Sequence, residues 1–199
     1  MEIGGLKWAT MNIGANSVTD YGLYFQWGDT QGYTAAQCGR GGGKKFFGWE
    51  DYKYGNGTTD PGETGMTKYN SSDGKTVLDA SDDAATAAWG GNWRMPTSAE
   101  FQMLGTAVNS AWTSDYQGSG VSGFVLTDKT DSSKVLFFPL VGECYCGSVM
   151  YAGRYGSYWS SSLVNNSLNY ARYFFSGNSV FWNEYNYRYN GYAVRGVAD

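Results

Sequence analysis

The sequence contains no histidine, and this absence excludes several kinds of catalysis at once. Ser-His-Asp and Cys-His catalysis, imidazole sites for zinc or iron, and the commonest general base all need an imidazole ring. Charge is also scarce, since Asp, Glu, Lys and Arg make up 16% of the chain and leave a net charge of −4. A mildly acidic protein lacks the basic surface that holds nucleic acid, so we expect no nucleic-acid partner.

Long hydrophobic runs are missing as well. The longest, residues 135–141 (VLFFPLV), falls far short of the roughly 20 apolar residues that span a bilayer, so no membrane insertion is expected. Residues 1–3 (MEI) show neither the basic start nor the apolar stretch of a signal peptide. We therefore expect that either the chain is not secreted by the signal-peptide route or further sequence precedes Met1, and favour the second.

Only three cysteines are present, Cys38, Cys144 and Cys146, and their number argues against a scaffold built on disulfides. A bridge between Cys144 and Cys146, two residues apart, would be strained. Three cysteines without a histidine do not make a usual zinc site, so no metal and no other cofactor is expected. The sequence predicts partly buried free thiols, which is how unpaired cysteines usually occur.

Aromatic residues and glycine are abundant, with 18% Phe, Trp and Tyr and 29 glycines. Helical bundles are rich in Ala, Glu, Lys and Leu, and disordered chains are poor in aromatics, so this composition indicates a loop-rich β or α+β domain. The 199 residues suffice for a proper core, and we expect one domain over 1–199. Residues 33–75 are expected to form long loops, anchored by Phe46, Phe47, Trp49, Tyr52 and Tyr54.

The local patterns predict an α+β fold of antiparallel sheets with two helices and long loops. The first helix covers 79–89, with acidic residues in its first turns and a Gly-Gly stop. The second follows Pro96, where Thr97 as N-cap and Glu100 form a capping box. Strands are predicted at 121–128 and 134–140, paired as a hairpin, and at 158–163, 170–176, 179–183 and 191–197, with a turn at 176–178.

Residues 163–190 have a composition of their own. Their 28 positions hold seven Asn and five Tyr but no Lys, Asp, Gln, Met or Pro. Side chains alternate along a strand, so if the bulky Trp182 points inward, Phe181 and Asn183 point outward. Tyr and Asn with small residues are typical of antibody binding surfaces. The alternative is that these aromatics cover the loops of 33–75.

Several motifs resemble, in order, those of the major paralogous domain family known from Fibrobacter and Bacteroidetes. They are residues 8–15 (WATMNIGA), 21–30 (YGLYFQWGDT), 82–85 (DDAA), 89–97 (WGGNWRMPT) with Glu100, 158–162 (YWSSS) and 191–195 (GYAVR). The resemblance spans nearly the whole chain and implies a C-type lectin-like fold, similar to its formylglycine-generating-enzyme branch. This family also supplies variable proteins of diversity-generating retroelements, whose C-terminal segment is rewritten by adenine-directed mutagenesis.

That mechanism predicts which residue types occur. Changing the adenines of an AAC or AAT codon for Asn gives many residues, Tyr, Phe and Ser among them, but never Lys, Gln, Glu, Met or Trp. In 163–190 only Trp182 and Glu184 lie outside this set, and both are assigned to the fixed scaffold.

The resemblance implies a variable region within 158–195 and divides its positions into two groups. The ligand-binding positions are Val164, Asn165, Asn166, Leu168, Asn169, Tyr173, Phe175, Phe181, Asn183, Tyr185, Asn186, Tyr187, Tyr189, Asn190 and Tyr192. The fixed positions are Trp159, Ser160, Ser161, Ala171, Trp182, Arg188, Gly191, Val194 and Arg195.

The resulting hypothesis is a non-catalytic binding module, extracellular, at the tip of a phage tail fibre or on a bacterial surface adhesin. Its partner would be a protein or glycan on a target cell. Weak individual contacts would call for several copies, so a homo-oligomer or mounting on a fibre is expected.

Four alternatives compete with it. An invariant adhesin or a calcium-independent glycan-binding lectin would have a similar composition. Calcium-dependent sugar binding is disfavoured because Glu184 is the only acidic residue near the lectin-like sequence at 182–184. A formylglycine-generating enzyme is disfavoured by the spacing of Cys144 and Cys146, and the Asp82–Asp83 pair is more typical of a helix start than of catalysis.

Overall fold

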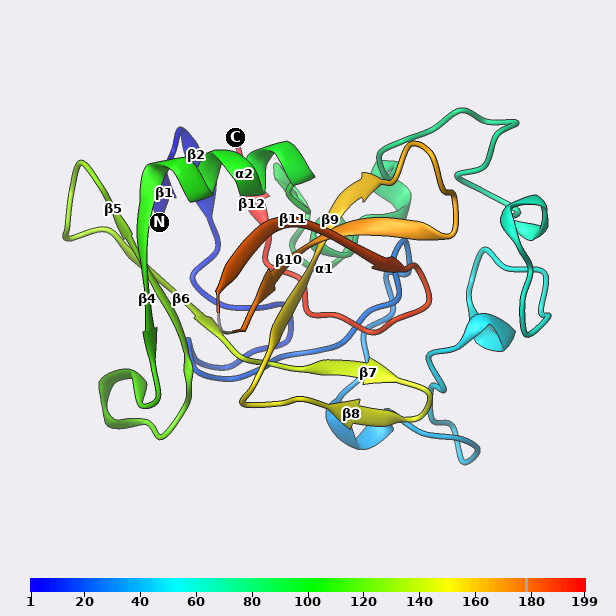
Figure 1. The fold of residues 1–199 in the computed structure, drawn as a ribbon, viewed down its shortest axis with the longest axis horizontal. Coiled ribbons are helices and arrows are strands. Elements are labelled where there is room, and N and C mark those ends of the chain that lie inside the picture. Colours follow the sequence, from blue (N-terminus) through cyan, green and yellow to red (C-terminus); the bar gives the residue numbers. More distant parts are fainter. Residues whose placement is uncertain (178) are drawn as a thin grey trace.

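The computed structural model describes residues 1–177 and 179–199, but not the side chains of Glu63 and Phe181. It confirms a mixed α+β fold (Figure 1). Within the described residues the strands of each sheet pair in an antiparallel manner, and two α-helices accompany them.

One sheet joins the two ends of the chain. In the order β1–β2–β12–β3, its strands are Glu2–Ile3, Leu6–Trp8, Val197–Ala198 and Trp93–Arg94. Val197 pairs with Trp8 on one side and with Arg94 on the other. Both termini therefore lie at the same end of the molecule (Figure 1).

A second sheet has the order β4–β5–β6, with strands Val108–Thr113, Gly123–Asp128 and Val135–Pro139. The predicted hairpin of β5 and β6 is confirmed, with Leu126 opposite Leu136. The sequence does not predict β4, because its residues (VNSAWT) show no apolar alternation and Trp112 is 57% exposed. Pairing along the whole edge of β5 makes it a strand.

The third sheet, in the order β11–β10–β9, separates two hydrophobic cores. Its strands are Gly156–Leu163 (β9), Tyr170–Ser176 (β10) and Val180–Tyr187 (β11). On one face, Phe174 and Trp182 pack in the core that contains Phe101. On the other face, Trp159 and Tyr173 pack in the core formed with the long loops. Trp182 thus points inward as predicted, and both faces of the sheet are covered.

The predicted bounds of these strands hold to different degrees. β9 and β10 match the prediction closely, whereas β11 continues four residues past Asn183 to Tyr187. Asn178 of the predicted turn lies outside the described residues.

The strand predicted at 191–197 is wrong. Gly191, Tyr192 and Ala193 make single bridges to three different segments, and only Val197–Ala198 forms a strand. The segment is buried on all sides, so its backbone groups pair with several partners in turn instead of one neighbouring strand.

The helices follow their capping signals. Thr97 caps α2 (Ser98–Ala107): its hydroxyl accepts from the Glu100 amide at 3.2 Å, and a Glu100 carboxylate oxygen accepts from the Thr97 amide at 2.7 Å. The first helix is shorter than predicted. Asp83 is the N-cap of α1 (Ala84–Trp89), and a 3₁₀ turn, η4 (Ala80–Asp82), precedes it. A capping side chain ends the preceding turn because its own backbone must be extended.

The long loops of 33–75 are confirmed. Among the described residues, the helical elements of these loops are the 3₁₀ turns η1 (Ala35–Gln37), η2 (Trp49–Asp51) and η3 (Glu63–Gly65). Another 3₁₀ turn, η5 (Tyr116–Gly118), lies between β4 and β5. Phe47, Trp49, Tyr52 and Tyr54 are buried, as expected of anchors, while Phe46 is half-buried. Aromatic packing replaces regular backbone pairing in holding this region.

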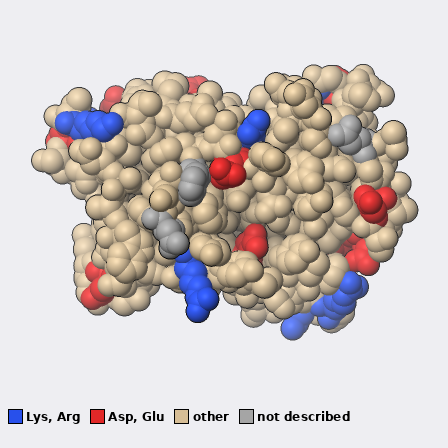
Figure 2. Space-filling view, viewed as in Figure 1, with Lys and Arg blue, Asp and Glu red and all other residues tan. Residues whose placement is uncertain are grey.

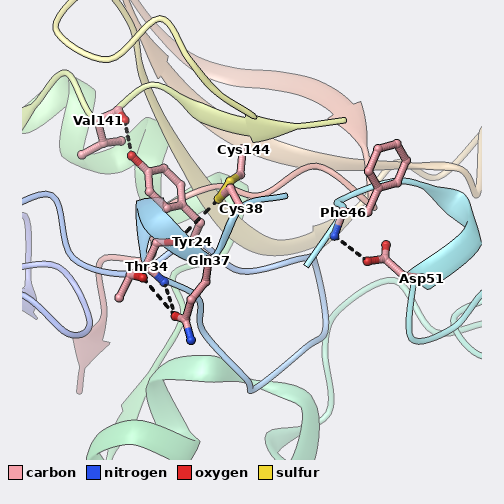
Figure 3. Close-up of a disulfide and its surroundings, with 8 residues drawn as sticks. All are labelled: Tyr24, Thr34, Gln37, Cys38, Phe46, Asp51, Val141 and Cys144. Carbon is pink, nitrogen blue, oxygen red and sulfur yellow. Dashed lines mark hydrogen bonds between the residues drawn. A yellow bond between two sulfur atoms is a disulfide. The ribbon is translucent and has the colours of Figure 1, made fainter. Parts of the chain in front are cut away.

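The expectation of three free thiols is wrong. Cys38, beside η1, and Cys144, in the hairpin of β7 (Glu143–Tyr145) and β8 (Ser148–Met150), form a disulfide (Figure 3). Their Cα atoms lie 6.2 Å apart across a separation of 106 residues, and only Cys146 is free and exposed. Residues so far apart in sequence offer no local signal of pairing, which is why the cysteine count misled.

We predict that the disulfide contributes measurably to stability. Replacing Cys38 and Cys144 together by Ala should lower the free energy of unfolding by about 2–5 kcal/mol, because the bridge restricts the unfolded chain over a long loop. Urea unfolding under non-reducing conditions measures this. Cys146→Ser is the matched control and should change stability little, and an equal loss in both variants would contradict a structural role for the bridge.

Candidate functional site

The predicted variable positions separate into three groups by exposure. Asn165, Asn166 and Tyr185 are exposed, and Tyr185 is the most accessible tyrosine at 55%. Half-buried are Val164, Leu168, Asn169, Tyr173, Phe175, Asn183, Asn186 and Tyr187. The side chain of Phe181 lies outside the described part of the structure.

Tyr189, Asn190 and Tyr192 form the third group, and their predicted display on the surface is wrong. All three are buried, with Tyr192 fully so. The Tyr189 ring packs edge-on against Trp49 of the long loops at 4.7 Å between centroids. Tyr187 contacts the same tryptophan at 5.9 Å. Tyr187 and Tyr189 therefore cover the loop region, as the alternative interpretation held.

The hairpin of β7 and β8 meets the chain beyond β11 in a cleft of about 230 Å³, here called the hairpin cleft. It is lined by Glu143, Tyr145, Met150, Tyr151, Asn186, Tyr187, Tyr189 and Asn190. Half of these residues are predicted binding positions, and the hairpin residues are new. The sequence could have indicated the hairpin residues by the alternation of side chains in 143–145, which places Glu143 and Tyr145 on the face opposite Cys144.

A close backbone approach fixes the position of the hairpin. The Cys144 amide donates to the Gly191 carbonyl, and the Gly191 amide donates to the Cys144 carbonyl, both at 2.8 Å. A Cβ atom on Gly191 would lie 2.4 Å from a ring carbon of Phe47 and 2.6 Å from the Cβ of Cys144. Only glycine permits this contact, in agreement with the assignment of Gly191 to the scaffold.

Tyrosine rings form the walls of the hairpin cleft. Tyr187 and Tyr189 stack with centroids 5.2 Å apart and an angle of 10° between their planes. Tyr145 lies against Tyr189 at 6.1 Å and 25°. Tyr170 continues the row on the other side of Tyr187, at 4.5 Å. In this row the rings cover one another's faces and hold one another in place, which leaves little rotamer entropy to lose on binding.

The floor of the cleft is polar. The Tyr192 hydroxyl accepts from the Asn186 amide at 2.7 Å and from the Asn190 amide at 3.3 Å. The Oδ1 atom of Asn190 is buried without a hydrogen-bond partner. Burial raises the pKa of Glu143, although a hydrogen bond with Tyr192 opposes the shift. The face that carries β7, β8 and β11 is otherwise mostly uncharged (Figure 2).

A second depression, of about 370 Å³, holds other predicted positions. The turn between β9 and β10 contributes Asn165, Asn166 and Leu168, and the loop of residues 70–76 lies opposite. Seven of the fifteen predicted binding positions thus line two separate depressions, both near the end of the β10–β11 pair where Tyr170 pairs with Tyr187.

The Asp82–Asp83 pair has a structural role. Asp83 accepts from the amides of Ala85 and Thr86 at the start of α1. Asp82 pairs with Lys68 and with Lys53, and these groups hold the pKa of its carboxyl well below the usual range despite burial. Within residues 1–177 and 179–199 no group of three or more Cys, Asp or Glu side chains could hold a metal ion.

No helix in the described part of the chain is long and apolar enough to cross a membrane. No family model matches the chain, and neither a curated protein nor a solved structure does.

We predict that replacing two tyrosines of the predicted binding set affects the free energy of unfolding very differently. Tyr189→Ala should lower the free energy of unfolding by about 3–5 kcal/mol, because it removes a buried ring from between Trp49 and Tyr187. Tyr185→Ala should change it by about 0.5 kcal/mol or less, since that side chain is exposed. Urea unfolding of both variants measures the difference, and similar losses would contradict the division into core and surface rings.

Proposed function

We propose that the chain is a non-catalytic binding module with a C-type lectin-like fold, and that its exposed C-terminal residues are diversified to bind changing partners. Three features support the fold: the terminal strands pair with each other, long loops follow the first strands, and the Tyr/Asn-rich segment forms an antiparallel sheet. The observation that carries the function is that seven of the fifteen predicted variable positions line two depressions of a rigid framework.

The framework tolerates changes at those positions because other residues hold the backbone. Arg188, fully buried, donates to the Tyr52 hydroxyl at 2.8 Å and to the Tyr69 and Leu168 carbonyls at 3.1 and 2.9 Å. Arg195, equally buried, donates to Asn12 at 2.8 Å. Arg188 and Arg195 were both assigned to the fixed scaffold. Exposed and half-buried side chains between such anchors can vary without refolding the chain, whereas the buried Tyr189 and Tyr192 belong to the core.

An extracellular place on a phage tail fibre or bacterial adhesin is part of the proposal. Disulfides persist in oxidising surroundings and are rare in the cytosol, so the Cys38–Cys144 bridge supports it. The partner would be a protein or glycan of a target cell. Because single contacts in shallow depressions are weak, several copies on a fibre or in an oligomer would supply avidity.

The DNA around the gene tests diversification. We expect a near-identical repeat close to the gene, next to a reverse-transcriptase gene, that differs from the coding copy only at adenines. The differences should fall in codons of the exposed and half-buried predicted binding positions and leave those of Trp182, Arg188 and Gly191 unchanged. Sequencing the locus in several isolates measures this. An intact locus without a repeat would contradict diversification and favour an invariant adhesin.

The binding surface is tested with two exposed rings. Replacing Tyr145 and Tyr185 by Ala should reduce the binding of multimerised protein to target cells at least about tenfold, because exposed aromatic anchors supply much of an interface's energy. Flow cytometry against a panel of bacterial strains measures binding. Trp112→Ala, which removes an equally exposed ring from β4, is the matched control. Equal losses in the two proteins would place the binding surface elsewhere.

A further inference from the structure

Among the described residues that line it, the hairpin cleft presents a carboxyl group and no cationic side chain. Its one ionisable carboxyl is that of Glu143, and no Lys or Arg lines it. The Asn186 and Asn190 amide groups each donate one N–H to the Tyr192 hydroxyl. The buried Asn190 Oδ1 atom, without a partner, adds a further negative end of a dipole at the floor. The ligand that complements this floor carries donors and positive charge.

The walls favour a planar cation. The faces of aromatic rings attract cations through the ring quadrupole, and arginine stacks on them more often than lysine does. Tyr187 and Tyr145 cover the two faces of Tyr189, so the ring available for such stacking is the exposed Tyr145, which lies two residues from Glu143 on the same face of β7. A guanidinium lying along such a ring keeps its N–H groups in plane and free to donate to the carboxylate.

The size of the cleft indicates one side chain. At about 230 Å³ it lies below the roughly 300–1,000 Å³ typical of sites for larger small molecules.

From this we infer that the hairpin cleft binds the guanidinium of an arginine side chain displayed by a partner protein. The inference rests on the proposed function, because it names the partner chemistry of the same surface. Glu143 and Tyr145 lie in the hairpin, outside the diversified segment. The cation would therefore be a constant element of recognition, while Tyr185 and the neighbouring variable positions distinguish one partner from another.

A titration with small probes tests the inference on the intact chain. We expect N-acetyl-arginine amide to cause saturable shifts in ¹H–¹⁵N spectra at the amides of Tyr145, Tyr187 and Asn190. The neutral isostere N-acetyl-citrulline amide should bind at least about tenfold more weakly, because it lacks the charge but keeps the shape. Equal binding of the two probes, or no saturable shift with the arginine probe, would overturn the inference.

Two carboxyl variants locate the charge. Glu143→Gln should weaken binding of the arginine probe at least about tenfold, whereas Glu184→Gln, on β11 outside the cleft lining, should leave it unchanged. Unchanged binding by the Glu143→Gln protein would overturn the inference. If that variant does not fold, the comparison of arginine with citrulline decides alone. Saturable binding of methyl glycosides in place of the arginine probe would reassign the cleft to glycans.

The inference and the proposed function fail separately. A locus without a template repeat, together with selective arginine binding, would remove diversification and keep the cation site. A locus with the repeat, together with equal binding of arginine and citrulline, would keep diversification and remove the cation site.

Discussion

The buried guanidinium of Arg188 is the contact on which the rest of this structure depends. It donates hydrogen bonds to the Tyr52 hydroxyl and to the carbonyls of Lys68, Tyr69 and Leu168. The loop from Tyr52 to Tyr69 is thereby tied to the chain just after β11. Because the acceptors are mostly backbone carbonyls, they do not depend on which side chains the loop carries. Removing a buried charge's partners is costly, so the loop and the sheet are held in one arrangement.

That arrangement explains why the Tyr/Asn-rich segment is not an open binding face. The loops anchored by Arg188 cover one side of the β9–β10–β11 sheet and α2 covers the other, so Tyr189 and Tyr192 become core rings. What remains accessible is the turn between β9 and β10 and the end of β11 beside the hairpin. The disulfide and the Cys144–Gly191 backbone contact hold that hairpin from behind (Figure 3). A binding surface on such supports is organised before any partner arrives, which reduces the entropy lost on binding.

Local signals in the sequence were reliable where the physical cause was local. The Thr97–Glu100 capping box, the hairpin of β5 and β6 and the inward Trp182 each depend on neighbours within a few residues, and each is confirmed. The errors have a common origin in long-range packing. β4 is a strand only because β5 pairs with it, the segment after Asn190 contacts several partners instead of one, and Cys38 meets a cysteine 106 residues away.

By itself the sequence determined the chemical character of this protein: no imidazole, little charge, and a C-terminal segment rich in rings and amides. Composition depends only on which residues are present, so it could be read directly. Which rings are exposed was decided by the tertiary structure alone. Alternation along β11 distinguishes two faces, yet it does not reveal that loops cover one of them. Nor does it reveal that Glu143 and Tyr145, from a hairpin some forty residues earlier in the chain, complete the cleft.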